Sequence, residues 1–237
     1  MARLETPVLP SRLFRYRSLT RSPEALEEEV DAVKENYLYC STFDRMNDPM
    51  EGYFRPTSAF KGDANYKHTL RRIVGVKTNI GVSCFSETRD DLLMWTHYAG
   101  NHAGICVAYS SKKLEAGLSD DVSLVRLGYG DAPPLVSSSE AQYADRAARK
   151  ILSQKKLNWS YEREWRVLGP VGKVPIGGSL AVTDVYFGSR VSLQHRQKFL
   201  TKIQGTKIRA YSMEVDMYDH DWEPVNAAAK NWESNRS

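Results

Sequence analysis

The most informative segment of the chain reads Trp159-Ser160-Tyr161-Glu162-Arg163-Glu164-Trp165-Arg166. Charged and aromatic residues alternate along it, which favours a β-strand, and a period of two then places Glu162, Glu164 and Arg166 on one face. Two carboxylates and a guanidinium in a row are costly to bury without polar partners. We therefore expect this face either to hold a polar ligand or to form the charged side of an edge strand.

The composition is that of an ordinary globular protein. The chain has 237 residues, of which 41% are hydrophobic and 26% charged, with a net charge of +4. No run approaches the roughly 18 to 20 apolar residues of a membrane span, so no membrane partner is expected. The first ten residues lack a secretory leader, and three cysteines without C-x-x-C spacing indicate free thiols. Together these features predict a cytoplasmic protein.

The order of the predicted elements indicates the fold class. Strand-like patterns cover residues 11–17, 37–43, 80–86, 104–110, 122–129, 159–166, 180–187 and 207–215, and helical patterns cover 22–33, 90–99, 138–156 and 193–203. Strands outnumber helices and do not alternate strictly with them, which favours α+β over a doubly wound parallel sheet. We expect a single α+β domain over residues 11–218, with a mainly antiparallel or mixed sheet and flanking helices. Residues 219–237 are expected to form a polar tail that frays.

Four motifs occur in a fixed order along the chain: Arg15-Tyr16-Arg17, Asn47-Asp48-Pro49-Met50-Glu51, Met94-Trp95-Thr96-His97-Tyr98 and Glu162-Arg163-Glu164-Trp165-Arg166. In this set the chain resembles a bacterial family known as domain of unknown function 2971, over roughly residues 13–188. The resemblance implies no activity. Because some members of the family lie among phage-defence genes, it does imply a role in antiviral defence or as a toxin-like effector.

The chain also resembles the Arg-Ser-Glu type of ADP-ribosyltransferases, whose fold is a split sheet. An arginine in the first strand, a Ser-Thr pair in the second and a Glu-x-Glu on a later strand carry this resemblance. It implies an enzyme that uses NAD as substrate and transfers ADP-ribose to a macromolecule or to water. The implied catalytic residues are Glu164, assisted by Glu162. The implied cofactor-binding residues are Arg15 or Arg17 on the phosphates, with Tyr16, Ser41, Thr42, His97, Tyr98, Trp165 and Arg166 around the dinucleotide.

The chemistry of these residue types is consistent with that reading. A guanidinium binds pyrophosphate through two hydrogen bonds, and a carboxylate near the ribose stabilises the positive charge that develops as nicotinamide leaves. The indoles of Trp159 and Trp165 offer flat walls for a base or nicotinamide ring. The expected partners are therefore a nucleotide ligand and a protein or nucleic-acid acceptor.

Two other functions remain open from the residues alone. Asp48, His97 and His102 could form a His-His-carboxylate centre in a metal-dependent hydrolase or nuclease, although a buried histidine bonded to backbone is the simpler interpretation. A non-enzymatic module that senses a nucleotide or nucleic acid is the third reading, consistent with basic residues such as Lys67, Arg71 and Arg72. The turn at Asn47–Gly52 either redirects the chain or contributes Asp48 or Glu51 to a site. Phosphate-loop, dinucleotide-fold and G-x-S-x-G signatures are absent.

Overall fold

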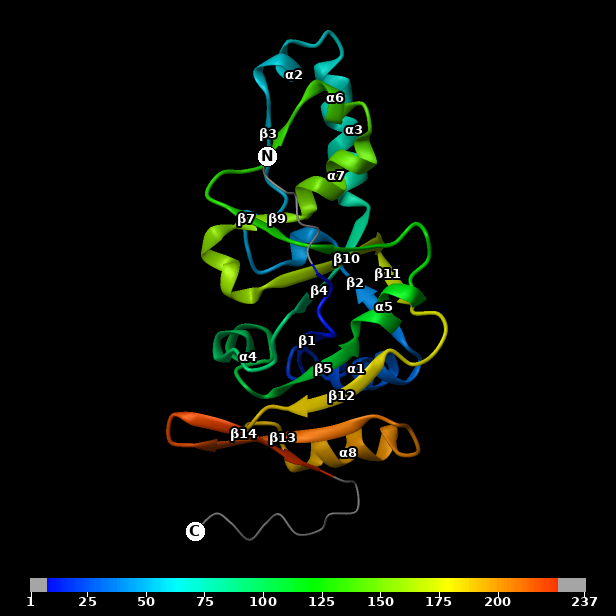
Figure 1. The fold of residues 1–237 in the computed structure, drawn as a ribbon, viewed down its shortest axis with the longest axis vertical. Helices are drawn as coiled ribbons and strands as arrows, with labels where there is room; N and C mark the ends of the chain where they lie inside the picture. The colour runs from blue at the N-terminus through cyan, green and yellow to red at the C-terminus, as the bar shows by residue number, and fades with distance from the viewer. Residues whose placement is uncertain (1–7, 226–237) are drawn as a thin grey trace. The chain divides into compact units, whose positions relative to one another are not determined.

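The computed structural model describes residues 8–225, and these divide into two compact units. The first unit consists mainly of Tyr37–Glu87 and Leu118–Pro175, and the second of Pro10–Asn36, Thr88–Gly117 and the chain from Ile176 onward. Helices and strands mix in both units, as the ribbon in Figure 1 shows. The expected α+β class is confirmed.

In the first unit the principal strands are antiparallel and follow the order β4-β10-β6. Their bounds are Ile80–Ser86 for β4, Glu164–Pro170 for β10 and Ser123–Arg126 for β6. Three short pairs accompany them: β2 (Tyr37–Cys40) with β11 (Gly172–Pro175), β3 (Arg55–Pro56) with β8 (Leu135–Val136), and β7 (Gly128–Gly130) with β9 (Gln154–Lys156). The last two pairs are parallel.

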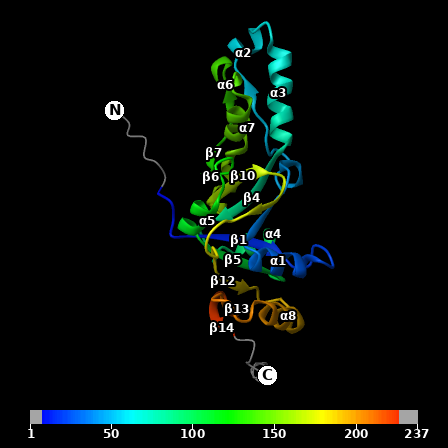
Figure 2. The same ribbon diagram turned by 90° about the vertical axis from the view of Figure 1, so that its right-hand side faces the viewer.

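The helices of the first unit bury an apolar cluster of their own. They are α2 (Ser58–Gly62), α3 (Tyr66–Thr78), α6 (Ser138–Ala141) and α7 (Ala144–Leu152), with 3₁₀ turns η1 (Phe43–Arg45) and η2 (Leu157–Glu162). Figure 2 shows α3 and α7 side by side. Ala147 and Ile151 of α7 pack with Ile73 of α3 and with Phe60 of α2. Small alanines on α7 allow this close approach of the two helices.

The second unit is built on strands in the order β14-β13-β12-β5-β1. Their bounds are Arg12–Ser18 for β1, Gly104–Ser110 for β5, Val182–Phe187 for β12, Arg209–Asp216 for β13 and Asp219–Pro224 for β14. Only β12 and β13 are parallel among these pairs, and α8 (Leu193–Ile203) connects them. The other helices are α1 (Ala25–Lys34), α4 (Leu92–Tyr98) and α5 (Ser111–Gly117). The expected mixed, largely antiparallel pairing is confirmed.

The segment Trp159–Arg166 is not one strand, which corrects the expectation from its alternating pattern. Residues Leu157–Glu162 form the 3₁₀ turn η2, and β10 begins only at Glu164. Between them Arg163 has a φ of 45°, in the left-handed region. Residues other than glycine rarely adopt this backbone conformation, so the sequence pattern does not predict that the strand begins only after Arg163. Glu164 and Arg166 nevertheless share a face of β10, as a period of two requires.

Two further expectations need correction. The helical pattern over 138–156 is divided into α6 and α7, and its last residues form strand β9. Residues 219–224, assigned to the polar tail, form β14, which pairs antiparallel with β13. The remainder of that tail, 226–237, lies outside the described residues. Among the described helices, none has the length and apolar character needed to span a bilayer.

Candidate functional site

Arg166 lies at the centre of a buried charge network in the first unit. Its side chain is fully buried, and it donates from Nε and Nη2 to the two oxygens of Glu164 at 2.7 and 3.1 Å. Nη1 and Nη2 donate to the two oxygens of Glu51 at 2.7 and 3.0 Å, and Nη1 also donates to the carbonyl of Leu152 at 2.7 Å. A guanidinium has five N–H donors, so every one of them is satisfied.

Lys155 of β9 extends the network on the other side of Glu164. Its Nζ donates to Glu162 Oε2 at 2.6 Å and to Glu164 Oε2 at 3.3 Å, and it lies 4.7 Å from the ring centroid of Trp159. Burial alone lowers the pKa of Lys155, but the charges of Glu164 and Glu162 outweigh it and raise the pKa above its ordinary value. The ammonium is therefore charged at neutral pH.

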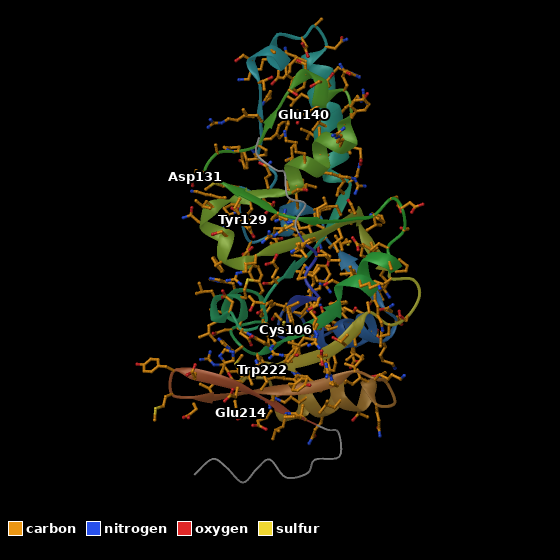
Figure 3. All side chains as sticks on the ribbon, viewed as in Figure 1. Cys106, Tyr129, Asp131, Glu140, Glu214 and Trp222 are labelled. Carbon is orange, nitrogen blue, oxygen red and sulfur yellow. The ribbon has the colours of Figure 1, made fainter. Side chains whose placement is uncertain are left out.

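Glu164 is held as a carboxylate by these cations. Burial raises its pKa, but the charges of Arg166 and Lys155 and the hydrogen bond from Arg166 outweigh that effect and bring the pKa to about 2. The backbone N–H of Glu164 also donates at 2.8 Å to the hydroxyl of Tyr129 on β7, a residue labelled in Figure 3. We call Glu51, Lys155, Glu162, Glu164 and Arg166 the Arg166 network. Three carboxylates against two cations give it one excess negative charge.

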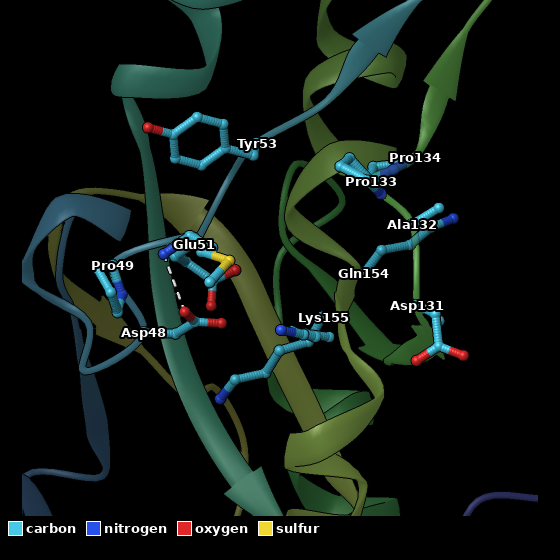
Figure 4. Close-up of a pocket in the computed structure, with 13 residues that line it drawn as sticks. Asp48, Pro49, Glu51, Tyr53, Asp131, Ala132, Pro133, Pro134, Gln154 and Lys155 are labelled. Carbon is cyan, nitrogen blue, oxygen red and sulfur yellow. Dashed lines mark hydrogen bonds between the residues drawn. The ribbon is translucent and has the colours of Figure 1, made fainter.

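A cavity of about 370 Å³ adjoins the network in the first unit. Three segments line it, and Figure 4 shows them around a common space. They are Asp48, Pro49, Met50, Glu51 and Tyr53 of the turn; Gly130, Asp131, Ala132, Pro133 and Pro134 after β7; and Gln154, Lys155 and Lys156 of β9. Glu51 and Lys155 belong to both the cavity wall and the Arg166 network.

Asp48 is a largely buried acid of this cavity. The residue is only 6% exposed, and its Oδ1 accepts a hydrogen bond from the backbone N–H of Met50 at 2.9 Å. Within residues 8–225 its second oxygen, Oδ2, has no hydrogen-bond partner. Figure 4 shows Asp48 and Lys155 reaching toward the same space from opposite walls. Oδ2 is not one of the fully buried unpaired polar atoms of the described residues, so it is accessible from the cavity. An accessible, unpaired carboxylate oxygen can accept a hydrogen bond from a ligand.

Lys77 of α3 supports the turn that carries Asp48. The turn ends at Gly52, whose φ of +72° suits glycine, and Lys77 Nζ donates to the Gly52 carbonyl at 2.7 Å. The same ammonium lies 4.4 Å from the ring centroid of Phe43. Burial lowers the pKa of Lys77, although the charge of Glu51 opposes that shift. Local turn chemistry and one buried lysine together position Asp48 and Glu51.

The other expected residues of the first unit lie away from the cavity lining. Trp165 is buried and donates from Nε1 to Glu87 Oε1 at 2.9 Å. Ser41 pairs through its backbone with Val82, and Thr42 precedes the 3₁₀ turn η1. The structure therefore brings Glu162, Glu164 and Arg166 together. Trp165 and Ser41 make other contacts, and Thr42 lies at the N-cap position of η1 without a side-chain capping bond.

The expected phosphate-binding arginines belong to the second unit. Arg17 Nε donates to Glu29 Oε1 at 2.6 Å, and Arg15 Nη1 lies 3.9 Å from Glu29 Oε2. Burial raises the pKa of Glu29, but the charges of Arg17, Arg15 and Arg21 outweigh it and lower the pKa. The Tyr16 hydroxyl donates to the carbonyl of Thr88 at 2.9 Å. Both arginines are thus placed around a buried carboxylate.

The two histidines of the metal hypothesis are also in the second unit, whereas Asp48 is in the first. His97 is exposed on α4, beside Tyr98 at 6.3 Å between ring centroids. His102 stacks on Trp95 at 6.1 Å, and burial lowers its pKa. In the part of the chain that the structure describes, no three His, Cys, Asp or Glu side chains gather as metal ligands.

Sequence reasoning missed Lys155 and the cavity itself. Lys155 fell inside the expected helix 138–156, and nothing in that pattern distinguishes it from an exposed helical lysine. Glu51 and Asp48 had a signal, because both belong to the Asn47–Gly52 turn that was considered as a contributor to a site. The partner of Glu51 is Arg166, 115 residues away in sequence, and local patterns do not pair such residues.

Comparison with known proteins gives a family resemblance and no activity. A family model described as protein of unknown function (DUF2971) matches residues 94–167, part of the span over which the four motifs were found. No curated protein and no solved structure matches the chain, so nothing found supports the resemblance to ADP-ribosyltransferases. The chain is thus similar to this family over a stretch that includes most of α4, all of β9 and the Glu162–Arg166 part of the Arg166 network.

Proposed function

We propose that the cavity of the first unit binds a nucleotide through its planar base or nicotinamide ring. The observation that carries this proposal is Asp48, whose Oδ2 faces the cavity from a residue that is only 6% exposed and lacks a partner among the described residues. A ligand N–H at that oxygen would make a charge-assisted hydrogen bond, worth about 1.5–3 kcal/mol.

The shape of the cavity supports a flat ligand. Its volume of about 370 Å³ lies within the range of small-molecule sites. Pro133 and Pro134 line one wall, and Tyr53 and Pro49 lie across from them in Figure 4. Proline and tyrosine rings offer flat apolar surfaces at little cost in conformational entropy. Such walls suit an aromatic ring.

The polar groups of the cavity support a ring with a hydrogen-bonding edge. Asp48 offers an acceptor, and Lys155 offers an ammonium that its two carboxylate neighbours keep charged. Adenine and the nicotinamide carboxamide each present a donor beside an acceptor on one edge. Acceptor and donor in one cavity are complementary to that pattern.

The reaction proposed for this site is ADP-ribosyl transfer from NAD. Breaking the bond between nicotinamide and ribose leaves the electron pair on nicotinamide and positive charge on the ribose, which a nearby carboxylate stabilises. Water or a nucleophile of the acceptor then bonds to that ribose carbon and releases a proton. Both oxygens of Glu164 are already bonded to Arg166 or Lys155. Asp48, with a free oxygen among the described contacts, is the better-placed acid for that role.

The test is a thermal-shift titration with NAD, ATP and GTP, with nicotinamide release followed in the NAD tubes. If the folded state binds a probe, its melting temperature rises with ligand concentration. Asp48→Asn should weaken that binding by about 10- to 100-fold, since it removes one charge-assisted hydrogen bond. Nicotinamide release by the unaltered chain and not by Asp48→Asn would establish cleavage of NAD.

Asp44→Asn is the matched control, because Asp44 lies on η1 near the same turn, is exposed and does not line the cavity. It makes the same change of charge and should leave every Kd unchanged. Equal weakening by both variants, or no stabilisation by any of the three probes at millimolar concentration, would overturn the proposal.

A further inference from the structure

The solvent-facing side of α3 carries four basic residues, beside Val74, Gly75 and Thr78. Lys67, Arg71 and Arg72 are exposed on this helix, together with His68, and we call these four residues the α3 basic face. At 3.6 residues per turn they fall within an arc of about 140° on the helix surface. The buried side of α3 bears Ile73 and Lys77, and Ile73 packs in the apolar cluster with α2 and α7. The helix is therefore fixed in the first unit with its cations turned outward.

These cations have no ion-pair or hydrogen-bond partner within the described residues. Elsewhere in the same unit half-buried cations pair with acids: Arg149 with Asp145 at 2.9 Å and Lys150 with Glu140 at 2.5 Å, on or near α7. α3 itself contains no acid, so it lacks the i,i+4 carboxylates that would neutralise it.

The helix and the residues beside it carry an excess of cations. Residues 58–79 hold five lysines and arginines against one acid, Asp63, which gives a net charge of +4. The net charge of the entire chain is also +4, so the remaining residues together are neutral. Because the cations of the α3 basic face are unpaired within the described residues, their single-sign field favours a polyanionic partner.

We propose that the α3 basic face binds the sugar–phosphate backbone of a nucleic acid without reading its bases. Two adjacent arginines provide planar forks that match phosphate oxygens bidentately. A membrane surface fits less well, because the apolar residues of α3 are turned into the unit and Val74, 40% exposed, is its one exposed large hydrophobic residue. This proposal is independent of the cavity and of its ligand.

The test is fluorescence anisotropy with a labelled 20-mer, as single-stranded RNA and as duplex DNA, at several salt concentrations with the full chain. The affinity should fall with salt, with a slope of log Kobs against log[salt] of about −2 to −3 for three phosphate contacts. Arg71→Gln with Arg72→Gln should reduce the magnitude of that slope by about two. Because both side chains are exposed, the melting temperature should not change.

Lys112→Gln with Lys202→Gln is the matched control, since both lysines are exposed on helices of the second unit and the net charge falls by the same amount. It should leave the slope unchanged. If the two double variants lowered the salt slope equally, the binding would depend on net charge alone, and the proposal would be overturned. If neither 20-mer bound at 20 mM salt, the proposal would also be overturned. Binding to vesicles of phosphatidylserine and phosphatidylcholine that the α3 variant abolishes while 20-mer binding persists would overturn it as well.

Discussion

Arg166 on β10 donates hydrogen bonds to both carboxylate oxygens of Glu51, at 2.7 and 3.0 Å, although the two residues are 115 positions apart in sequence. This bidentate pair fastens the turn that carries Asp48 to the strand that carries Glu164. The cavity wall is thereby connected to the buried charges behind it. The geometry of the proposed ligand site therefore depends on a buried ion pair, one member of which, Glu51, lines the cavity.

Replacing Arg166 with methionine should destabilise the protein strongly. The variant leaves Glu51 and Glu164 buried without their guanidinium, and loss of one partner from a buried pair costs about 3–5 kcal/mol. Urea denaturation measures the free energy of unfolding. Arg126→Met on neighbouring β6 is the control: Arg126 pairs with Glu87 at 3.0 Å but is half exposed, so its loss should cost less than about 1 kcal/mol. Similar costs for the two variants would contradict a special role for the Arg166 network.

Acid should weaken the folded state through Glu164. Its pKa is about 2 in the folded protein against an ordinary 4.5, so its stabilising contribution is complete above pH 4.5 and is lost as the pH falls toward 2. Glu164→Gln lacks that titration. The difference in unfolding free energy between the unaltered protein and this variant should therefore shrink between pH 4.5 and pH 3. Urea midpoints at pH 7, 4.5 and 3 measure it, and a constant difference across that range would count against the assignment.

Asp48→Asn should leave the stability unchanged or raise it. The amide oxygen of asparagine can still accept from Met50 N–H, as Oδ1 does at 2.9 Å, and no other described hydrogen bond of Asp48 is lost. For comparison, Asp91→Ala removes an N-cap whose Oδ1 accepts from Leu93 and Met94 N–H at 2.9 and 3.1 Å, and it should cost about 1 kcal/mol. Thermal unfolding of both variants checks this. A loss at Asp48→Asn as large as that at Asp91→Ala would mean that the carboxylate is kept for folding.

Elements with a strong local signal could be predicted from the sequence. The helix expected over 193–203 forms at those residues, and Ser192 caps it by accepting from His195 N–H at 3.2 Å. Strands β4 and β5 occupy the expected ranges because their continuous apolar runs are typical of buried strands. The Asn47–Gly52 turn was likewise readable from its turn-forming residues.

The rest depends on features that a local pattern does not carry. Arg163 adopts a left-handed φ of 45° without being glycine, and this places the start of β10 after it. Lys155 leaves the helical pattern to form β9 because tertiary contacts with Glu162 and Glu164 outweigh its propensity. The cavity itself arises from three segments far apart in sequence. Resemblance alone suggested Glu164 as the catalytic acid. Among the described residues both oxygens of Glu164 accept hydrogen bonds, whereas Oδ2 of Asp48 accepts none.

Two glycines of the first unit should respond in opposite ways to alanine. A Cβ at Gly81 on β4 would lie 2.5 Å from the carbonyl oxygen of Pro170 and 2.8 Å from Val171 Cα, both backbone atoms, so the two strands would have to shift. Gly81→Ala should therefore cost about 1–3 kcal/mol or more.

Gly75 is the matched position, because it lies on the exposed side of α3 with nothing within 4 Å of a Cβ. Gly75→Ala should stabilise the protein by up to about 1 kcal/mol, since alanine loses less backbone entropy in a helix. Urea denaturation of both variants gives the sign of the change in unfolding free energy for each. If Gly75→Ala were destabilising, α3 would not be the regular, solvent-exposed helix on which the basic face depends. If Gly81→Ala were neutral, the close approach of β4 to the chain around Pro170 would be wrong.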